Sequence, residues 1–183
     1  KRSNLNPIAN ARFHQLVADK NVDINTMECK RSQTFTPILS LCRNNRSLSL
    51  YPCLKAMLKR QDIDLQFKDT KSGNSALTLL CRDYDHYNLI NCVRLLVNSR
   101  IDINSQDLKG RNCLILLCRY YSKDNLLDLL RLLVEHGINV QATQTGNNWD
   151  ALTTLCCFYY KRENLTELVR FLLENGASNH SNA

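Results

Sequence analysis

Apolar residues recur along the chain in pairs of short runs. The clearest run lies at residues 125–134, where Leu126, Leu129, Leu130 and Leu133 occupy positions i, i+3, i+4 and i+7. This spacing places the four side chains on one face of an α-helix. A shorter apolar run that ends in cysteine precedes it, and a polar segment rich in Asp and Asn follows each pair. Every pair of runs therefore predicts two helices, and the polar segment predicts a hairpin loop.

The pattern occurs four times with a nearly constant period. Its cysteines, Cys42, Cys81, Cys118 and Cys156, lie 39, 37 and 38 residues apart. Such a period is typical of repeat proteins, because two helices and a hairpin cannot bury their apolar faces without neighbouring copies. We predict an all-α solenoid. It comprises a frayed segment at 1–6 and one repeat domain at 7–183, with a half-repeat at 7–33 and repeats that start near 34, 75, 112 and 150.

The half-repeat has the features of an end cap. From Pro7 to Lys20 the apolar residues Phe13, Leu16 and Val17 fit one amphipathic helix, and Pro7 suits a first helical turn. The unit is shorter and more polar than the later copies. We therefore expect one helix here, followed by the first hairpin.

The hairpin segments resemble those of the ankyrin repeat family. Residues 101–110 (IDINSQDLKG) follow the family pattern Ala-Asp-Val-Asn-Ala-x-Asp-x-x-Gly, and residues 36–39 (TPIL) stand where the family has Thr-Pro-Leu-His. The resemblance covers roughly residues 7–183. It implies an ankyrin-type α-solenoid of stacked helix pairs joined by hairpin loops.

The chain departs from the family pattern in two ways. The Thr-Pro pair is replaced by Ser-Ala, Asn-Cys and Asp-Ala at residues 75–76, 112–113 and 150–151. The Gly-His turn between the helices is missing, and each unit is about four to five residues longer than the family's 33-residue unit. The added length predicts extended helices and a deeper groove.

In ankyrin repeats, the residues after the second small position of the first helix point into the concave groove. The predicted groove residues are Arg43, Asn44, Arg82, Asp83, Tyr84, Arg119, Tyr120, Tyr121, Phe158 and Tyr159. With helices about 8–10 Å apart, the arginines form a row interleaved with aromatic side chains. Arg and Tyr contribute much of the energy at protein interfaces. A structural alternative stays open, in which the arginines tie loops together and the tyrosines cover the extra helical turn.

The hairpin tips vary more between the copies, which favours a contact role. The candidate tip residues are Lys30, Arg31, Lys68, Lys71, Leu108, Lys109, Arg111 and Trp149. Trp149 is the single tryptophan of the chain. An exposed indole at a tip would anchor a partner, whereas an indole packed against the next helix would be structural.

Asn104 is a candidate site of modification. Hairpin asparagines of this kind, with a leucine eight residues earlier (Leu96 here), resemble the substrates of the asparaginyl hydroxylase that acts on ankyrin repeats. Asn25 matches less well, and Gln66 and Gln141 replace the asparagine. The resemblance therefore implies hydroxylation of Asn104.

The positive charge is concentrated in the first part of the chain. The net charge is +7, and residues 1–71 hold 13 Lys/Arg against 6 Asp/Glu, while residues 72–183 hold 11 of each. A basic half can attract phosphate or an acidic protein, although a solvated surface gives the same count. Nine cysteines, four of them at one helical position, favour buried thiols and a reducing location in the cytoplasm or nucleus.

Motifs for other chemistry are missing from the sequence. There is no G-x-S-x-G, no phosphate-binding Gly/Lys loop, no H-E-x-x-H and no Cys/His zinc spacing, so we predict neither catalysis nor a metal or cofactor. No apolar run is long enough to cross a membrane. The leading hypothesis is therefore a non-enzymatic module that binds another protein. The alternative is a binder of an anionic ligand, such as an oligonucleotide or a phosphoinositide, through the basic half and the groove arginines.

The last predicted helix, at residues 165–173, is as apolar as the internal ones. Terminal repeats normally present a polar outer face. We therefore expect either that the array continues past Ala183 or that this face pairs with another chain.

Overall fold

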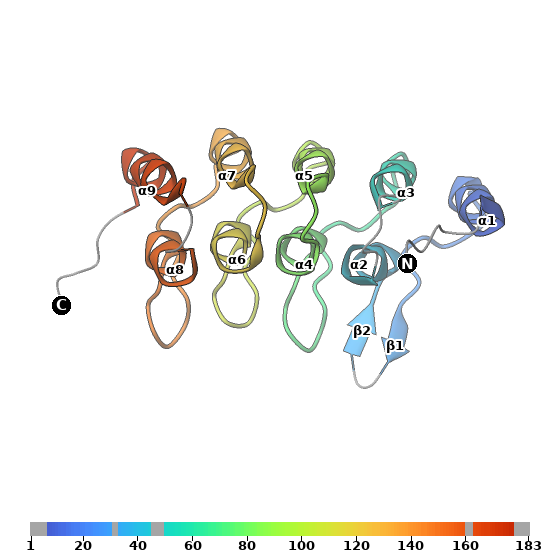
Figure 1. Ribbon diagram of the computed structural model, residues 1–183. Coiled ribbons are helices and arrows are strands. Elements are labelled where there is room, and N and C mark those ends of the chain that lie inside the picture. Colours follow the sequence, from blue (N-terminus) through green and yellow to red (C-terminus); the bar gives the residue numbers. More distant parts are fainter. Residues whose placement is uncertain (1–6, 31–32, 45–49, 160–162, 178–183) are drawn as a thin grey trace.

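The computed structural model describes residues 7–30, 33–44, 50–159 and 163–177. Its helices form two rows (Figure 1). One row contains α2 (Pro37–Asn44), α4 (Ala76–Asp83), α6 (Cys113–Tyr120) and α8 (Ala151–Phe158). The other contains α1 (Pro7–Ala18), α3 (Leu50–Met57), α5 (Leu89–Val97), α7 (Leu126–Glu135) and α9 (Leu165–Glu174). The first hairpin is a two-stranded antiparallel ribbon of β1 (Glu28–Lys30) and β2 (Gln33–Phe35).

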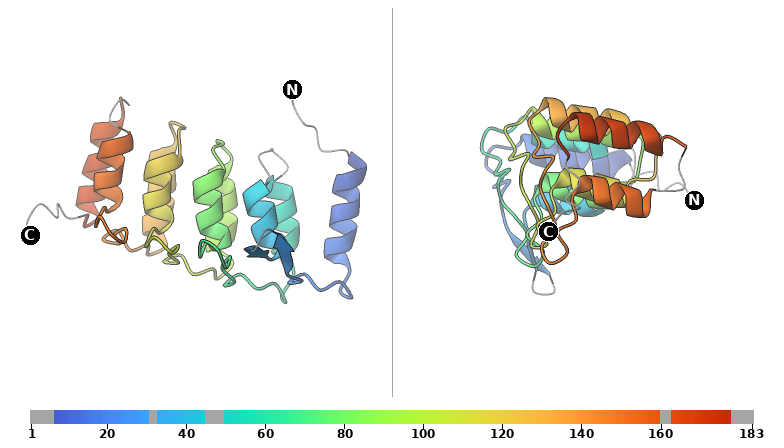
Figure 2. Two further views of the ribbon diagram at one scale, coloured as in Figure 1. Left: turned by 90° about the horizontal axis from the view of Figure 1, so that it is seen from below. Right: turned by 90° about the vertical axis from the view of Figure 1, so that its left-hand side faces the viewer.

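Successive helix pairs stack side by side. In the first row α4 packs between α2 and α6, and α6 packs against α8, while in the second row α5 packs between α3 and α7. The hairpins project away from both helix rows on one side of the stack, as the two views of Figure 2 show. The predicted all-α solenoid of stacked helix pairs is thereby confirmed.

We call the helices of the first row the inner helices and those of the second row the outer helices. In the later repeats, a side chain caps the start of the inner helix. The side chains of Ser75, Asn112 and Asp150 accept hydrogen bonds from backbone N–H groups three residues ahead, at 3.3, 3.1 and 2.7 Å. A capping oxygen satisfies an N–H group that has no partner inside the helix. The positions where the Thr-Pro pair is lost therefore keep a helix start by other means.

The added residues do not extend the helices, contrary to the expectation from repeat length. Each inner helix has eight residues, and in the second and third repeats residues 84–88 and 121–125 form the loop to the outer helix. Tyr84 and Tyr121 follow α4 and α6 with non-helical backbone angles, and both are buried. Burial of these rings accounts for the end of the helix at this point, because large aromatic surfaces contribute strongly when removed from water.

The core runs along the stack between the two rows. Cys42, Cys81 and Cys118 are all buried, as are the leucines of the outer helices that face them. The half-repeat contributes less. Val17 is buried and Phe13 partly so, but Leu16 is exposed, so the predicted apolar face of α1 is narrower than expected.

Hydrogen bonds from Asn and Gln side-chain amides recur between the loops of consecutive repeats. In three loops an Asn or Gln side chain donates to a backbone carbonyl of the next loop and accepts from an N–H two residues further on. The amides are Asn25, Gln66 and Asn104. Gln141 makes the donating half of the bridge to Gly176 O, at 3.2 Å. Glutamine therefore replaces asparagine without loss of the inter-repeat bond.

Candidate functional site

Three of the four predicted groove tyrosines lie in the interior, which corrects the prediction that they face a partner; Tyr120 is the exception. Tyr84, Tyr121 and Tyr159 are each at most 4% exposed. The Tyr121 hydroxyl lies 3.1 Å from His86 O and 2.7 Å from Asn125 Oδ1, so it holds the loops of two repeats together. Burial raises the pKa of Tyr84 to about 12. The structural alternative, in which these rings cover the added residues, agrees with this placement.

The predicted arginines occupy equivalent helical positions, but each meets a different partner. Arg43 lies over the Phe35 ring, with Cζ 4.8 Å from the ring centroid. Arg82 forms two hydrogen bonds with the Asp83 carboxylate, at 2.8 and 2.7 Å. Arg119 lies over the ring of Phe158 in the next repeat. The three side chains do not form a uniform row of uncompensated positive charge.

Four side chains at the third and fourth repeats form what we call the aromatic–arginine patch: Arg119, Tyr120, Trp149 and Phe158. Arg119 Cζ lies 4.3 Å from the Phe158 ring centroid and 5.4 Å from that of Tyr120. Phe158 and Trp149 have ring centroids 6.3 Å apart. Tyr120 and Phe158 are 41% and 47% exposed, while Arg119 and Trp149 are half-buried. The patch thus combines a stacked cation with exposed ring surface.

Arg111 borders the patch from inside. It was predicted as a hairpin-tip residue, but it is only 8% exposed, because its guanidinium binds the buried Asp107 carboxylate through Nε and Nη2 at 2.9 and 2.6 Å. Its Nη1 donates to the Tyr120 hydroxyl at 3.2 Å. Burial opposes ionisation of Tyr120, but this bond and the charges of Arg111 and Arg119 outweigh it and lower the pKa of Tyr120.

The pairing across each repeat was not predicted from the sequence. Arg111 contacts Tyr120, and Trp149 contacts Phe158, in both cases nine residues apart. The two pairs lie at equivalent places of consecutive repeats. In each pair the first residue precedes an inner helix and the second is the last residue of that helix. Comparing the residue before each inner helix with the last residue of that helix, copy by copy, would have revealed the pattern.

The remaining tip residues lie on a continuous edge. Lys68, Lys71, Leu108 and Lys109 are exposed, Leu108 at 70%. Leu108 N donates to Ser72 O at 2.9 Å, and Thr145 N donates to Lys109 O at 2.8 Å, so neighbouring hairpins are bonded to each other. Lys30 lies in β1 and Asn44 ends α2, and Arg31 falls outside the described residues.

Asn104 is already used by the fold. Its amide donates to Gly137 O at 3.2 Å and accepts from Asn139 N at 2.6 Å. An enzyme that modifies this amide would have to break both bonds. Hydroxylation of Asn104 remains a prediction.

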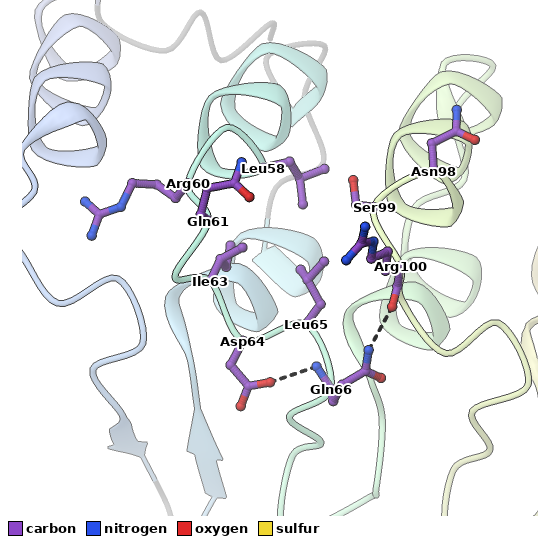
Figure 3. Close-up of a pocket in the computed structure, with 10 residues that line it drawn as sticks. All are labelled: Leu58, Arg60, Gln61, Ile63, Asp64, Leu65, Gln66, Asn98, Ser99 and Arg100. Atoms are coloured by element: carbon purple, nitrogen blue, oxygen red, sulfur yellow. Dashed lines mark hydrogen bonds between the residues drawn. The ribbon is translucent and has the colours of Figure 1, made fainter.

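A groove of about 520 Å³ lies between the C-terminal ends of α3 and α5 (Figure 3). Its floor carries Gln66, whose side chain donates to Arg100 O at 2.9 Å and whose N–H donates to Asp64 Oδ1 at 2.9 Å. These polar groups are therefore occupied by bonds that join the second and third loops. The groove lies where two repeats stack, and Gln66 on its floor is used for the bond between their loops.

The described residues contain no set of three or more His, Cys, Asp or Glu side chains arranged to hold a metal ion. Within the same ranges, no helix has the length and apolar character that crossing a bilayer requires.

The C-terminal face of the stack exposes positions that are buried elsewhere. Cys156 is exposed, whereas the equivalent Cys118 is buried. Leu165 and Val169 of α9 are only partly buried, although the equivalent leucines of α7 are fully buried. Leu173 is 45% exposed. This face therefore resembles the surface on which an internal repeat receives its neighbour.

Comparison with known proteins agrees with the geometry. The model of the family described as ankyrin repeats (3 copies) matches residues 84–183. Among solved structures, the chain is similar to the ankyrin repeat domain of Bcl-3, described as a unique member of the IkappaB protein family. The two share 23% identity and a TM-score of 0.64, and the match covers 93% of this chain and 65% of that one. No curated protein matches the sequence.

The likeness to Bcl-3 establishes the fold alone, and this chain spans about two thirds of the length of that domain. The family match is broader evidence, because it covers more than half of the chain, from Tyr84 through the last helix pair. Ankyrin repeats are generally a non-enzymatic fold that binds other proteins. The sequence pattern, the stacked helix pairs and the family match together show that this chain belongs to the ankyrin repeat family.

Proposed function

We propose that this chain is a recognition module that binds another protein through the aromatic–arginine patch and the adjoining hairpin tips. The observation that carries the proposal is the exposure of Tyr120 and Phe158 at neighbouring inner helices. Large aromatic side chains are the residues that dominate binding energy at protein interfaces. Arg111 donates a hydrogen bond to the Tyr120 hydroxyl and is itself held by the Asp107 carboxylate, which positions the Tyr120 ring.

The charge distribution favours a protein over an anionic ligand. Arg82 and Arg111 are each ion-paired with a carboxylate, and so is Arg60, which also donates to carbonyls of the half-repeat. A polyanion is bound by several uncompensated cations whose counterions are released. Arg82 is one of the groove arginines and Arg60 belongs to the basic first half, so two of the cations that would supply them are ion-paired within the fold. The anionic-ligand hypothesis loses much of its basis on this surface.

Site-specific photo-crosslinking tests the proposal. A photoreactive phenylalanine derivative is placed at position 120 or 158, and at position 87 as the control, since Tyr87 is 55% exposed, more than either patch residue, but lies outside the patch. We expect one protein, identified by mass spectrometry, to crosslink at 120 and 158 in 0.5 M salt, and purified partner to reproduce the adduct. Equal crosslinking at position 87, or adducts with nucleic acid, would contradict the proposal.

A second contact surface is proposed at the C-terminal face. We expect it to pair with a second copy of this chain, because Leu173 and Cys156 are exposed there. Sedimentation equilibrium over a hundredfold concentration range tests pairing: association that Leu173→Lys abolishes supports it. A strict monomer at all concentrations rules out self-pairing of this face.

A further inference from the structure

The aromatic–arginine patch has a composition that specifies the chemistry of its partner. We infer that it receives a short protein segment in which a carboxylate side chain lies within two residues of a large apolar side chain. The inference rests on the proposed function and goes beyond it, since it states which groups of the partner meet which groups of the patch.

Arg119 is the cation that would bind the carboxylate of the partner. The ion pairs of the described side chains join Arg60, Arg82, Arg111 and Lys123 to aspartates, and none of them includes Arg119. Its guanidinium instead stacks on Phe158 and lies beside Tyr120. Stacking occupies the faces of the guanidinium plane, whereas its N–H groups lie in the plane. The Tyr120 hydroxyl interacts with one part of this edge, and a carboxylate can bind the remaining N–H groups of Arg119 while the stack is kept.

The rings supply the second half of the specificity. Phe158 is 47% exposed and packs against the half-buried Trp149. An apolar side chain placed on these rings removes more ring surface from water. Because Arg119 and Trp149 both contact Phe158, the carboxylate and the apolar group have to be close together in the partner.

A single carboxylate fits this patch better than a nucleic-acid backbone. The flanking cations, Arg82 and Arg111, already bind Asp83 and Asp107, and the Asp83 carboxylate is partly exposed. Among the described patch residues and their flanking cations, a row of phosphates would meet one arginine without an ion pair, Arg119, and a nearby negative charge. Binding of polyanions depends on several phosphate contacts, so the charge pattern matches one acidic side chain.

Selection from a random dodecapeptide phage library tests the inference. Clones are selected on the purified 183-residue chain, synthesised with a fluorescein label, and measured by fluorescence polarisation. We expect enrichment of Asp or Glu within two residues of Trp, Phe or Leu. Replacing that acid by its amide should weaken binding roughly tenfold, as should Arg119→Gln, and the two changes together should cost little more than one alone.

Arg94→Gln is the matched control, because Arg94 is exposed on α5, whereas the patch residues lie on α6, on α8 and just before α8. It should leave affinity unchanged, and thermal unfolding should show that Arg119→Gln is folded. Peptides that need Phe158 but ignore both the acid and Arg119 overturn the inference and leave the proposed function intact. A library without Phe158-dependent peptides also overturns it, and the crosslinking experiment then decides on the proposed function separately. Binding of labelled (dT)20 that falls steeply with salt and with Arg119→Gln overturns it in favour of nucleic acid.

Discussion

A buried carboxylate organises the hairpin tips of two repeats. Asp69 accepts backbone N–H bonds from Lys71, Ser72 and Asn74, and Asp107 accepts them from Lys109 and Arg111. The carboxylate takes the place of backbone partners that a tight turn cannot supply. At Asp107 the same group also binds the Arg111 guanidinium. One aspartate thus shapes a hairpin and, through Arg111, positions Tyr120.

Arg100 is held in an unfavourable backbone conformation. Its φ is 62°, at the loop position where the following repeats have Gly137 and Gly176. A residue with a Cβ atom is disfavoured in this region, whereas glycine is not. We predict that Arg100→Gly raises the free energy of unfolding by roughly 0.5–1 kcal/mol, measured by urea denaturation. Arg94→Gly, within helix α5, is the comparison and should lower stability by about 1 kcal/mol; a loss of stability in Arg100→Gly would contradict the argument.

At the scale of the elements, the loops between helix pairs are joined by polar bonds. The Asp85 carboxylate accepts from Ser122 N at 2.8 Å, Ser122 Oγ at 2.5 Å and Lys123 Nζ at 2.9 Å, all from the next repeat. Partial burial favours the neutral acid, but these bonds to the charged form outweigh it and lower the pKa of Asp85. The loop between the helices of the second repeat is therefore in contact with the corresponding loop of the third.

The lowered pKa of Asp85 predicts a dependence of stability on acid. Because its folded-state pKa lies below the ordinary value near 4, the stabilisation is present above about pH 4 and is lost as the pH falls through the folded-state pKa. Asp85→Asn should therefore lower stability at pH 7, by at most about 1 kcal/mol for a partly exposed pair. Its stability should also fall less steeply than that of the wild type below pH 4. Urea denaturation from pH 7 to 3 measures both, with the exposed Glu135→Gln as control; parallel curves for Asp85→Asn and wild type would refute the assignment.

Local signals in the sequence determined the elements but not the surface. Periodic leucines predicted the outer helices, and the cysteine register predicted the repeat, because both patterns arise from burial that every copy shares. The burial of Tyr84 and Tyr121 was not predicted, since it depends on where the added residues leave the helix. The fate of each arginine depends on a neighbour such as Asp83, Asp107 or Phe158 that comes close only after folding. Comparing the repeats one aligned position at a time could place Arg119 but could not distinguish it from Arg82.

At the scale of the whole molecule, the thiols are divided by the stack. All nine cysteines are free, and Cys42, Cys53, Cys81, Cys92, Cys113 and Cys118 are buried. Burial raises the pKa of the thiols at 42, 53, 81, 92 and 118, to about 12 at Cys92. An interior with this many reduced thiols agrees with the prediction of a reducing location, which remains a prediction.

This division predicts a simple labelling pattern. At pH 7.5 iodoacetamide should modify no more than three thiols of the folded chain, those of the exposed Cys29, Cys156 and Cys157. All nine should react in denaturant, as counted by intact-protein mass spectrometry. Modification of the repeated position, Cys42, Cys81 or Cys118, under native conditions would show that the inner helices do not pack as described.

The central claim is that the aromatic–arginine patch carries most of the binding energy for a protein partner. With the crosslinked partner purified, isothermal titration calorimetry of Tyr120→Ala and Phe158→Ala measures this directly. We predict that each variant loses about 2 kcal/mol of binding free energy, roughly thirtyfold in affinity, while Tyr87→Ala changes it by less than about 0.5 kcal/mol. Wild-type affinity in both patch variants, or an equal loss in Tyr87→Ala, would contradict the claim.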